Sequence, residues 1–196
     1  MPIKFKFQNM DKGAWVLLRQ VYNLVLKCED QVFSEHKLTT EQHTLLMAVK
    51  NISGPVRITD IAQWLDRTPN SVSMLVDRMV KAGLVKRVRD RKDRRTVFVS
   101  MTAKAEKAYA PATAAGWALI QEILSPLSNE DKRALISLLE TLRDKTYDYL
   151  GSGEVTEEVR RNETQVVQLT KRAAKSKQRP GLKTKGQGGR KKRAVR

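Results

Sequence analysis

Residues 67–85 read RTPNSVSMLVDRMVKAGLV, and this stretch carries the start and stop signals of an α-helix. Thr68 is a good N-cap, and Pro69 fits the first helical position, where its missing N–H is not needed. Gly83 suits the position just past the helix end, because glycine readily adopts the left-handed conformation found there. One apolar face follows from the spacing of Val72, Leu75, Val76 and Met79. The stretch therefore predicts a helix over 68–83 with one buried face and one polar face.

A shorter helix is predicted just upstream, in ITDIAQWLD, after a short strand at residues 56–58. Thr59 is its expected N-cap, and Asp60 falls in the first turn, where the helix dipole favours a negative charge. A short helix, a tight turn and a longer helix make up a helix-turn-helix. In such units the second helix enters the major groove of DNA.

A charged β-hairpin is predicted directly after the long helix. The stretch RDRKDRR, residues 89–95, separates two strands of alternating polarity. Asp90 and Asp93 can bridge neighbouring cations that would otherwise repel each other, so we expect both to stabilise the hairpin tip. A charge run usually marks only a solvated surface. Its position after a helix-turn-helix instead favours a DNA-binding wing over residues 87–97.

The helix before this unit carries a heptad-like apolar seam, and Asp11 is its expected N-cap. Its members are Ala14, Leu18, Val21, Val25, Cys28 and Val32. A second seam runs through residues 135–149. Seams of this kind pack either within one chain or between two copies of it, and the periodicity leaves both alternatives open.

Three further helix starts are predicted from capping signals. They are the capping box of Thr39 with Gln42, the N-cap Thr102, and the capping box of Ser128 with Asp131. Pro111 lies within the helix that follows Thr102, and we expect it to kink that helix unless it marks a break.

The order of these elements resembles the MarR family (multiple antibiotic resistance regulators) of winged-helix repressors. The resemblance rests on ITDIAQWLD, SVSMLVDRMVKAGLVKR and DRKDRRTVFVSMT, and it covers roughly residues 10–150. Lys92 and Met101 depart from the arginine and leucine usual at these positions in the family. The resemblance implies a mainly α fold with a small β-wing. It also implies a winged helix-turn-helix DNA-binding lobe joined to a helical dimerisation layer, and a homodimeric protein.

Four parts of the chain follow from this organisation. They are an N-terminal arm and dimerisation helix (1–38), the winged helix-turn-helix (39–102), the C-terminal dimerisation helices (103–150), and a polar linker with a disordered basic tail (151–196). The expected function is that of a sequence-specific transcriptional regulator, a repressor of neighbouring genes. We expect it to bind double-stranded DNA at a pseudo-palindromic operator and to be released from that operator by a small-molecule effector.

The expected DNA contacts fall on the long helix and on the wing. Asn70 could read adenine, Met74 or Pro69 could touch a thymine methyl group, and the nearby hydroxyls could bind phosphate. Arg78 could reach a phosphate or pair with a carboxylate such as Asp90. By the resemblance, Arg95 enters the minor groove. The full set comprises Thr68, Pro69, Asn70, Ser71, Ser73, Met74, Arg78, Arg91, Arg94 and Arg95.

The composition points to a polyanionic partner. Lys and Arg number 38 against 21 Asp and Glu, for a net charge of +17. Residues 171–196 contain 12 Lys or Arg and no acid. An alternative function is therefore a non-specific architectural DNA-binding protein driven by this tail. Without paired carboxylates, a nucleophile–base set or a phosphate-binding loop in the sequence, we expect no enzyme, no cofactor and no metal site.

Family members commonly bind a small aromatic or phenolic ligand between the dimer layer and the DNA-binding lobe. The resemblance thus implies an effector pocket here, with Trp15, Tyr22, His43 and Trp64 as its candidate lining. Cys28, the single cysteine, has acidic neighbours that oppose thiolate formation, which favours an inert thiol. The sequence has neither an apolar run of membrane-spanning length nor a signal-peptide pattern, and we expect a cytoplasmic protein.

Overall fold

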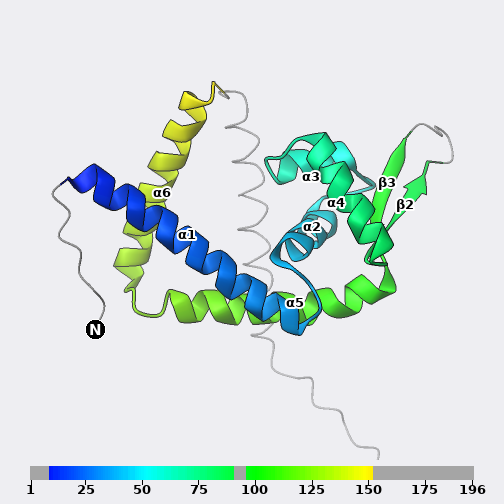
Figure 1. Cartoon of the computed structure of the whole chain (residues 1–196), viewed down its shortest axis with the longest axis horizontal. Coiled ribbons are helices and arrows are strands. Elements are labelled where there is room, and N and C mark those ends of the chain that lie inside the picture. The colour runs from blue at the N-terminus through cyan, green and yellow to red at the C-terminus, as the bar shows by residue number, and fades with distance from the viewer. Residues whose placement is uncertain (1–8, 91–95, 152–196) are drawn as a thin grey trace, which may run out of the picture. The chain divides into compact units, whose positions relative to one another are not determined.

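The computed structural model describes residues 9–90 and 96–151. Within them the chain is mainly helical, with one small antiparallel sheet (Figure 1). The helices are α1 (Met10–Glu35), α2 (Thr40–Asn51), α3 (Ile58–Trp64), α4 (Pro69–Lys81), α5 (Ala103–Ile123) and α6 (Asn129–Tyr149). The strands are β1 (Val56–Arg57), β2 (Val85–Arg89) and β3 (Val97–Met101). The predicted helix-turn-helix is α3 and α4, the hairpin strands are β2 and β3, and the expected fold class is confirmed.

The sheet has the strand order β1–β3–β2, and both strand pairs are antiparallel. β2 and β3 form the predicted hairpin, with Val85 opposite Met101 at its base. At its far end the N–H of Asp90 donates to the carbonyl of Thr96 at 3.0 Å. The hairpin is therefore in register along its whole described length.

Two predicted N-caps are wrong by two residues. Asn9, rather than Asp11, caps α1, because its side chain accepts a backbone N–H of the first turn at 3.0 Å. Arg57, rather than Thr59, precedes α3, because Asp60 reaches back and accepts the N–H of Arg57 at 2.8 Å. The predicted place of Asp60 in the first turn of α3 is confirmed.

The other predicted helix boundaries are confirmed. Gly83, with φ +69°, ends α4 in the left-handed region, and the N–H of Leu84 donates to the carbonyl of Met79 at 2.9 Å. α5 continues through Pro111 without a break. The confirmed caps are Thr39 with Gln42, Thr68, Thr102, and Ser128 with Asp131.

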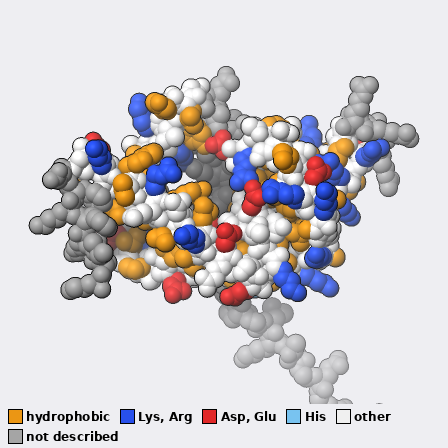
Figure 2. All heavy atoms as spheres, viewed as in Figure 1, with side chains coloured by type: hydrophobic (Ala, Val, Ile, Leu, Met, Phe, Trp, Pro, Cys, Tyr) orange, Lys and Arg blue, Asp and Glu red, His pale blue; other side chains and the backbone are white. Residues whose placement is uncertain are grey.

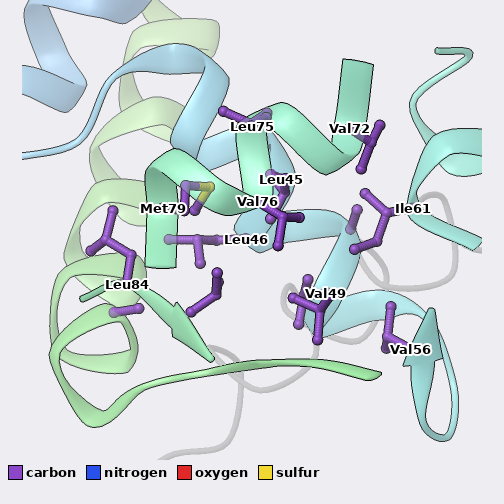
Figure 3. Packing of buried hydrophobic residues seen from close by; sticks show 14 of the residues in the cluster. Leu45, Leu46, Val49, Val56, Ile61, Val72, Leu75, Val76, Met79 and Leu84 are labelled. Carbon is purple, nitrogen blue, oxygen red and sulfur yellow. The ribbon is translucent and has the colours of Figure 1, made fainter. Parts of the chain in front are cut away.

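The hydrophobic core lies where α2, α3 and α4 meet the sheet. Figure 3 shows side chains from the three helices pointing toward one another. The largest fully buried side chains are Leu45, Leu46, Ile61, Met79, Val72, Val76 and Val85. Burial of each contributes roughly 1.5–3 kcal/mol relative to exposure. Because all four apolar positions predicted for α4 are buried, the opposite face of that helix is turned away from the core.

An aromatic stack joins α1, α2 and α5. The ring of His43 lies between Phe33, at a centroid distance of 4.1 Å, and Tyr109, at 5.4 Å. His43 Nε2 is 3.0 Å from the hydroxyl of Thr113. Burial lowers the pKa of His43 to about 4, so the ring is neutral at neutral pH. Phe33 also packs 3.0 Å from the point where a Cβ on Gly116 would lie.

Much apolar surface remains exposed on α1, α5 and α6. Figure 2 shows hydrophobic side chains gathered over α1 and α6. α6 has no buried residue, and Leu138 is 64% exposed. Val21, on the predicted seam of α1, is 55% exposed. Among the described residues, packing within one chain therefore leaves these two seams largely uncovered. In the same residues, no helix combines the length and the apolar character needed to cross a membrane.

Candidate nucleic-acid interface

The exposed face of α4 carries most of the residues predicted to contact DNA. Pro69, Asn70, Ser71, Met74 and Arg78 are exposed, and Ser73 is half-buried. Met74 is 62% exposed although it is apolar. A single exposed apolar side chain is ordinary on a protein surface, so Met74 is a candidate contact only through its place among the exposed polar residues of α4.

The N-terminus of α4 is capped by Thr68. Its Oγ1 accepts the N–H of Ser71 at 3.3 Å. The hydroxyl of Thr68 is therefore engaged within the helix start, whereas the helix dipole still favours an anion such as a phosphate there.

A second set of contacts ties the wing to α4. Arg87 on β2 donates from Nη2 to Ser73 Oγ at 3.2 Å and pairs with Asp77 Oδ1 at 3.0 Å. No local sequence pattern identifies a protein partner for Arg87 or for Asp77. The i, i+4 spacing of Ser73 and Asp77 is visible in the sequence, but only the return of β2 along α4 places Arg87 beside both.

A third set of contacts holds Arg78. Its Nη2 lies 3.2 Å from Glu41 Oε2, and Arg67 Nη1 lies 2.7 Å from Glu41 Oε1. The sequence allowed Arg78 a carboxylate partner and offered Asp90 as an example, and the structure gives Glu41 as a partner. Glu41 is on α2, outside the helix-turn-helix, and sequence reasoning missed it because no local pattern connects residues so far apart.

The tip of the wing lies outside the described residues. It includes the predicted contacts Arg91, Arg94 and Arg95 together with the predicted stabilising residue Asp93. Of the wing-stabilising pair, Asp90 is described, and its backbone closes the hairpin onto Thr96. The roles of these side chains stay predictions from the sequence.

A cavity of about 720 Å³ lies beside the turn between α3 and α4. Among its lining residues are Tyr22 and Leu26 of α1, Leu65 and Arg67 of the turn, and the carboxylates of Glu29, Asp30 and Glu41. Burial, together with the charge of Asp30, raises the pKa of Glu29. Hydrogen bonds from Thr40 lower the pKa of Asp30.

The four predicted pocket residues do not all line this cavity. Tyr22 lines the cavity. His43 is buried in the aromatic stack, Trp64 packs against the hydrophobic core, and Trp15 is 62% exposed on α1. None of these three is among the lining residues of this cavity. Cys28 is half-buried on α1.

The sequence and the fold both match known DNA-binding regulators. Residues 38–105 match the family model of a winged helix DNA-binding domain. The transcriptional regulator HosA of Escherichia coli O157:H7 is 30% identical over 118 residues, which are 56% of this chain and 87% of HosA.

Solved structures share the fold. The MarR-family regulator AbsC of Streptomyces coelicolor matches with a TM-score of 0.65 at 20% identity, over 74% of this chain and 99% of AbsC. The organohalide-sensing regulator RdhR, in its 2,4-dichlorophenol-bound form, matches with a TM-score of 0.66 at 23% identity, over 74% of this chain and 86% of RdhR. This chain belongs to the MarR family of winged-helix, DNA-binding transcriptional regulators.

Proposed function

We propose that this regulator is a homodimeric repressor of a pseudo-palindromic operator, with half-sites about 10–10.5 bp apart. In each half-site α4 lies in the major groove and the wing, residues 87–97, lies in the adjacent minor groove. The observation that carries the proposal is the outward face of α4, where Asn70 and Met74 are free of the core and Arg78 and Arg87 flank them.

The N-terminal half of α4 reads bases. Asn70 makes two hydrogen bonds to adenine, and Met74 with Pro69 contacts a thymine methyl group. Thr68 and Ser71 lie at the helix N-terminus, where backbone N–H groups and the helix dipole favour a phosphate. Ser73 already accepts a hydrogen bond from Arg87, so we assign it the positioning of Arg87 rather than base reading.

The wing reads groove shape. A narrow A·T-rich minor groove has an enhanced negative potential, which attracts an inserted arginine. We assign this insertion to Arg95, with Arg94 beside it and Arg91 on a phosphate. Asp90 and Asp93 hold the tip by pairing with its cations.

Dimerisation brings two such lobes onto one operator. The apolar residues of α6 and of the first half of α1 are exposed in the single chain, and a second copy would cover them. A two-fold dimer matches a two-fold operator, and binding at both half-sites multiplies affinity.

An effector in the cavity beside the α3–α4 turn would release the operator. RdhR has been solved with 2,4-dichlorophenol bound, and the DNA binding of BpsR from Bordetella bronchiseptica is regulated by 6-hydroxynicotinic acid. By analogy we propose a small aromatic effector for this chain, with Tyr22 as the aromatic contact.

Footprinting tests the function. The fragment upstream of the protein's own gene is the first target, with a random duplex of equal length as competitor. We expect protection of two half-sites. Arg95→Ala should weaken this binding by about 1–3 kcal/mol and reduce sequence preference. Wild-type affinity for Arg95→Ala would remove the wing from the interface.

The second candidate, a non-specific architectural protein, is favoured by the 12 Lys or Arg of residues 171–196. Deleting these residues separates the two functions. For a repressor, deletion lowers affinity and flattens the salt dependence by about 0.9 per lost phosphate contact, but the preference for the operator remains. For an architectural protein, the intact chain binds both duplexes equally and deletion abolishes binding.

A further inference from the structure

Glu41 lies at the start of α2, where its carboxylate forms ion pairs with two arginines. Oε1 is 2.7 Å from Arg67 Nη1, and Oε2 is 3.2 Å from Arg78 Nη2. Arg67 precedes α4, whereas Arg78 lies in its last turn. One carboxylate of α2 therefore bonds to residues at both ends of α4, which we call the recognition helix because we propose that it reads the DNA.

The carboxylate fixes Arg78 without hiding it. The side chain of Arg78 is 66% exposed, and that of Glu41 is 38% exposed. A guanidinium has five N–H donors, so the bond to Glu41 leaves others for a phosphate or a base edge. An arginine already held in one rotamer loses less side-chain entropy when it binds DNA.

The turn that contains Arg67 is fixed from another side as well. Its neighbour Asp66 has φ +50°, in the left-handed region that few non-glycine residues adopt. The hydroxyl of Tyr147, on α6, donates to Asp66 Oδ2 at 3.3 Å. The start of the recognition helix is thus held by α2 at Arg67 and by α6 at Asp66.

We propose that Glu41 is a positioning residue for DNA recognition, which presents Arg78 to the operator in a fixed orientation through the shared Arg67–Glu41–Arg78 bridge. This inference rests on the proposed function, because it needs an operator that the protein prefers over other DNA. Glu41 itself touches no DNA in this proposal.

The direction in which DNA affinity changes when the Glu41 carboxylate is removed distinguishes a positioning role from a purely electrostatic one. Removing a carboxylate beside a DNA-binding surface makes that surface more positive, which by itself tightens binding to every duplex. Loss of positioning instead weakens binding to the operator alone. Glu41→Gln therefore discriminates between the two, because glutamine keeps the shape of glutamate and loses its charge.

The experiment measures fluorescence anisotropy of the full chain with the footprinted operator and with a random duplex. We expect Glu41→Gln to weaken operator binding about 5–10-fold and to leave or strengthen random binding. The matched control is Glu106→Gln, which breaks the exposed Lys50–Glu106 bridge of 2.9 Å at the other end of α2. This control should change neither affinity more than twofold.

A double-mutant cycle assigns the effect to Arg78. If Glu41 acts through Arg78, Glu41→Gln adds little to the loss caused by Arg78→Ala. Arg78→Lys provides a second variant should Glu41→Gln fold poorly, because lysine keeps the charge without the planar fork and should also lose operator preference.

The experiment distinguishes failure of the proposed function from failure of the role assigned to Glu41. If the wild-type chain does not distinguish operator from random duplex, the proposed function fails, and the inference fails with it. If the wild type distinguishes them and Glu41→Gln keeps full operator affinity, or loses it additively with Arg78→Ala, only the positioning role of Glu41 is overturned.

Discussion

Arg87 on strand β2 and Asp77 on helix α4 form an ion pair of 3.0 Å across the junction between the wing and the recognition helix. Asp77 lies on the side of α4 that we propose faces DNA, and 54% of its side chain is exposed. An unpaired carboxylate at this place would repel phosphates. Arg87 compensates for that charge and at the same time holds β2 against α4. The angle between wing and recognition helix thus depends on this contact and on the bond from Arg87 to Ser73.

Asp77→Asn should therefore reduce specificity and increase general affinity. The released Arg87 becomes available to phosphates, so we expect random-duplex binding to strengthen a few-fold and the slope of log K against log salt to steepen by about 0.9. Operator preference should fall, because the wing is less firmly placed. Anisotropy titrations at several salt concentrations measure both effects. Asp148→Asn, an exposed carboxylate on α6, is the charge-matched control. An unchanged salt slope for Asp77→Asn would show that Arg87 does not gain a phosphate.

Acid should weaken the fold through His43. Burial lowers its pKa to about 4 in the folded chain, against about 6.5 when unfolded. The contribution of the neutral ring is complete above pH 6.5 and is lost as the pH falls toward 4, because the unfolded chain takes up the proton first. At 1.36 kcal/mol per pKa unit, the loss amounts to about 3 kcal/mol.

Urea denaturation between pH 7 and pH 4 measures this loss. His43→Phe preserves an aromatic ring between Phe33 and Tyr109 and cannot titrate, so its stability should decline less over the same range. The two proteins share all their carboxylates, and the difference between their curves isolates the histidine. Parallel curves would mean that His43 does not titrate in this window.

Charges on the apolar face of α6 should dissociate the dimer. Leu138 and Leu142 lie four residues apart on one face and are 64% and 52% exposed in the single chain. Replacing both with glutamate should give a folded monomer by light scattering, with operator affinity reduced at least tenfold because the two half-sites are no longer linked. Glu140→Lys, on the opposite face, should leave the dimer intact. A double variant that remained dimeric would place the interface elsewhere.

Gly83 should be required for its backbone conformation alone. Its φ is +69°, and a Cβ built there meets nothing within 4 Å. Gly83→Ala should therefore lower the free energy of unfolding by about 1 kcal/mol through backbone strain without a clash. Gly83→Asn should have a smaller effect, because asparagine tolerates the left-handed region better. Chemical denaturation of the two variants checks this order, and equal losses would contradict it.

The sequence by itself determined the local structure of the DNA-binding lobe. Thr68, Pro69 and Gly83 specify where α4 begins and ends, because capping and left-handed turns depend only on neighbouring residues. The 3.6-residue period specified which face of α4 is buried, and the alternation after Gly83 specified the hairpin. The same local rules failed at α1 and α3, where Asn9 and the backward reach of Asp60 start the helices two residues early.

Only the tertiary structure decided which polar side chains work together. Glu41 meets Arg78 across 37 residues of sequence, and Arg87 meets Asp77 through the return of β2 along α4. The sequence could not separate His43 and Trp64 of the core from Tyr22 of the cavity, because aromatic residues at helical spacing suit both. Local signals act between neighbours in the chain. Ion pairs and cavities depend on the packing of distant elements, and that packing is set by the whole core at once.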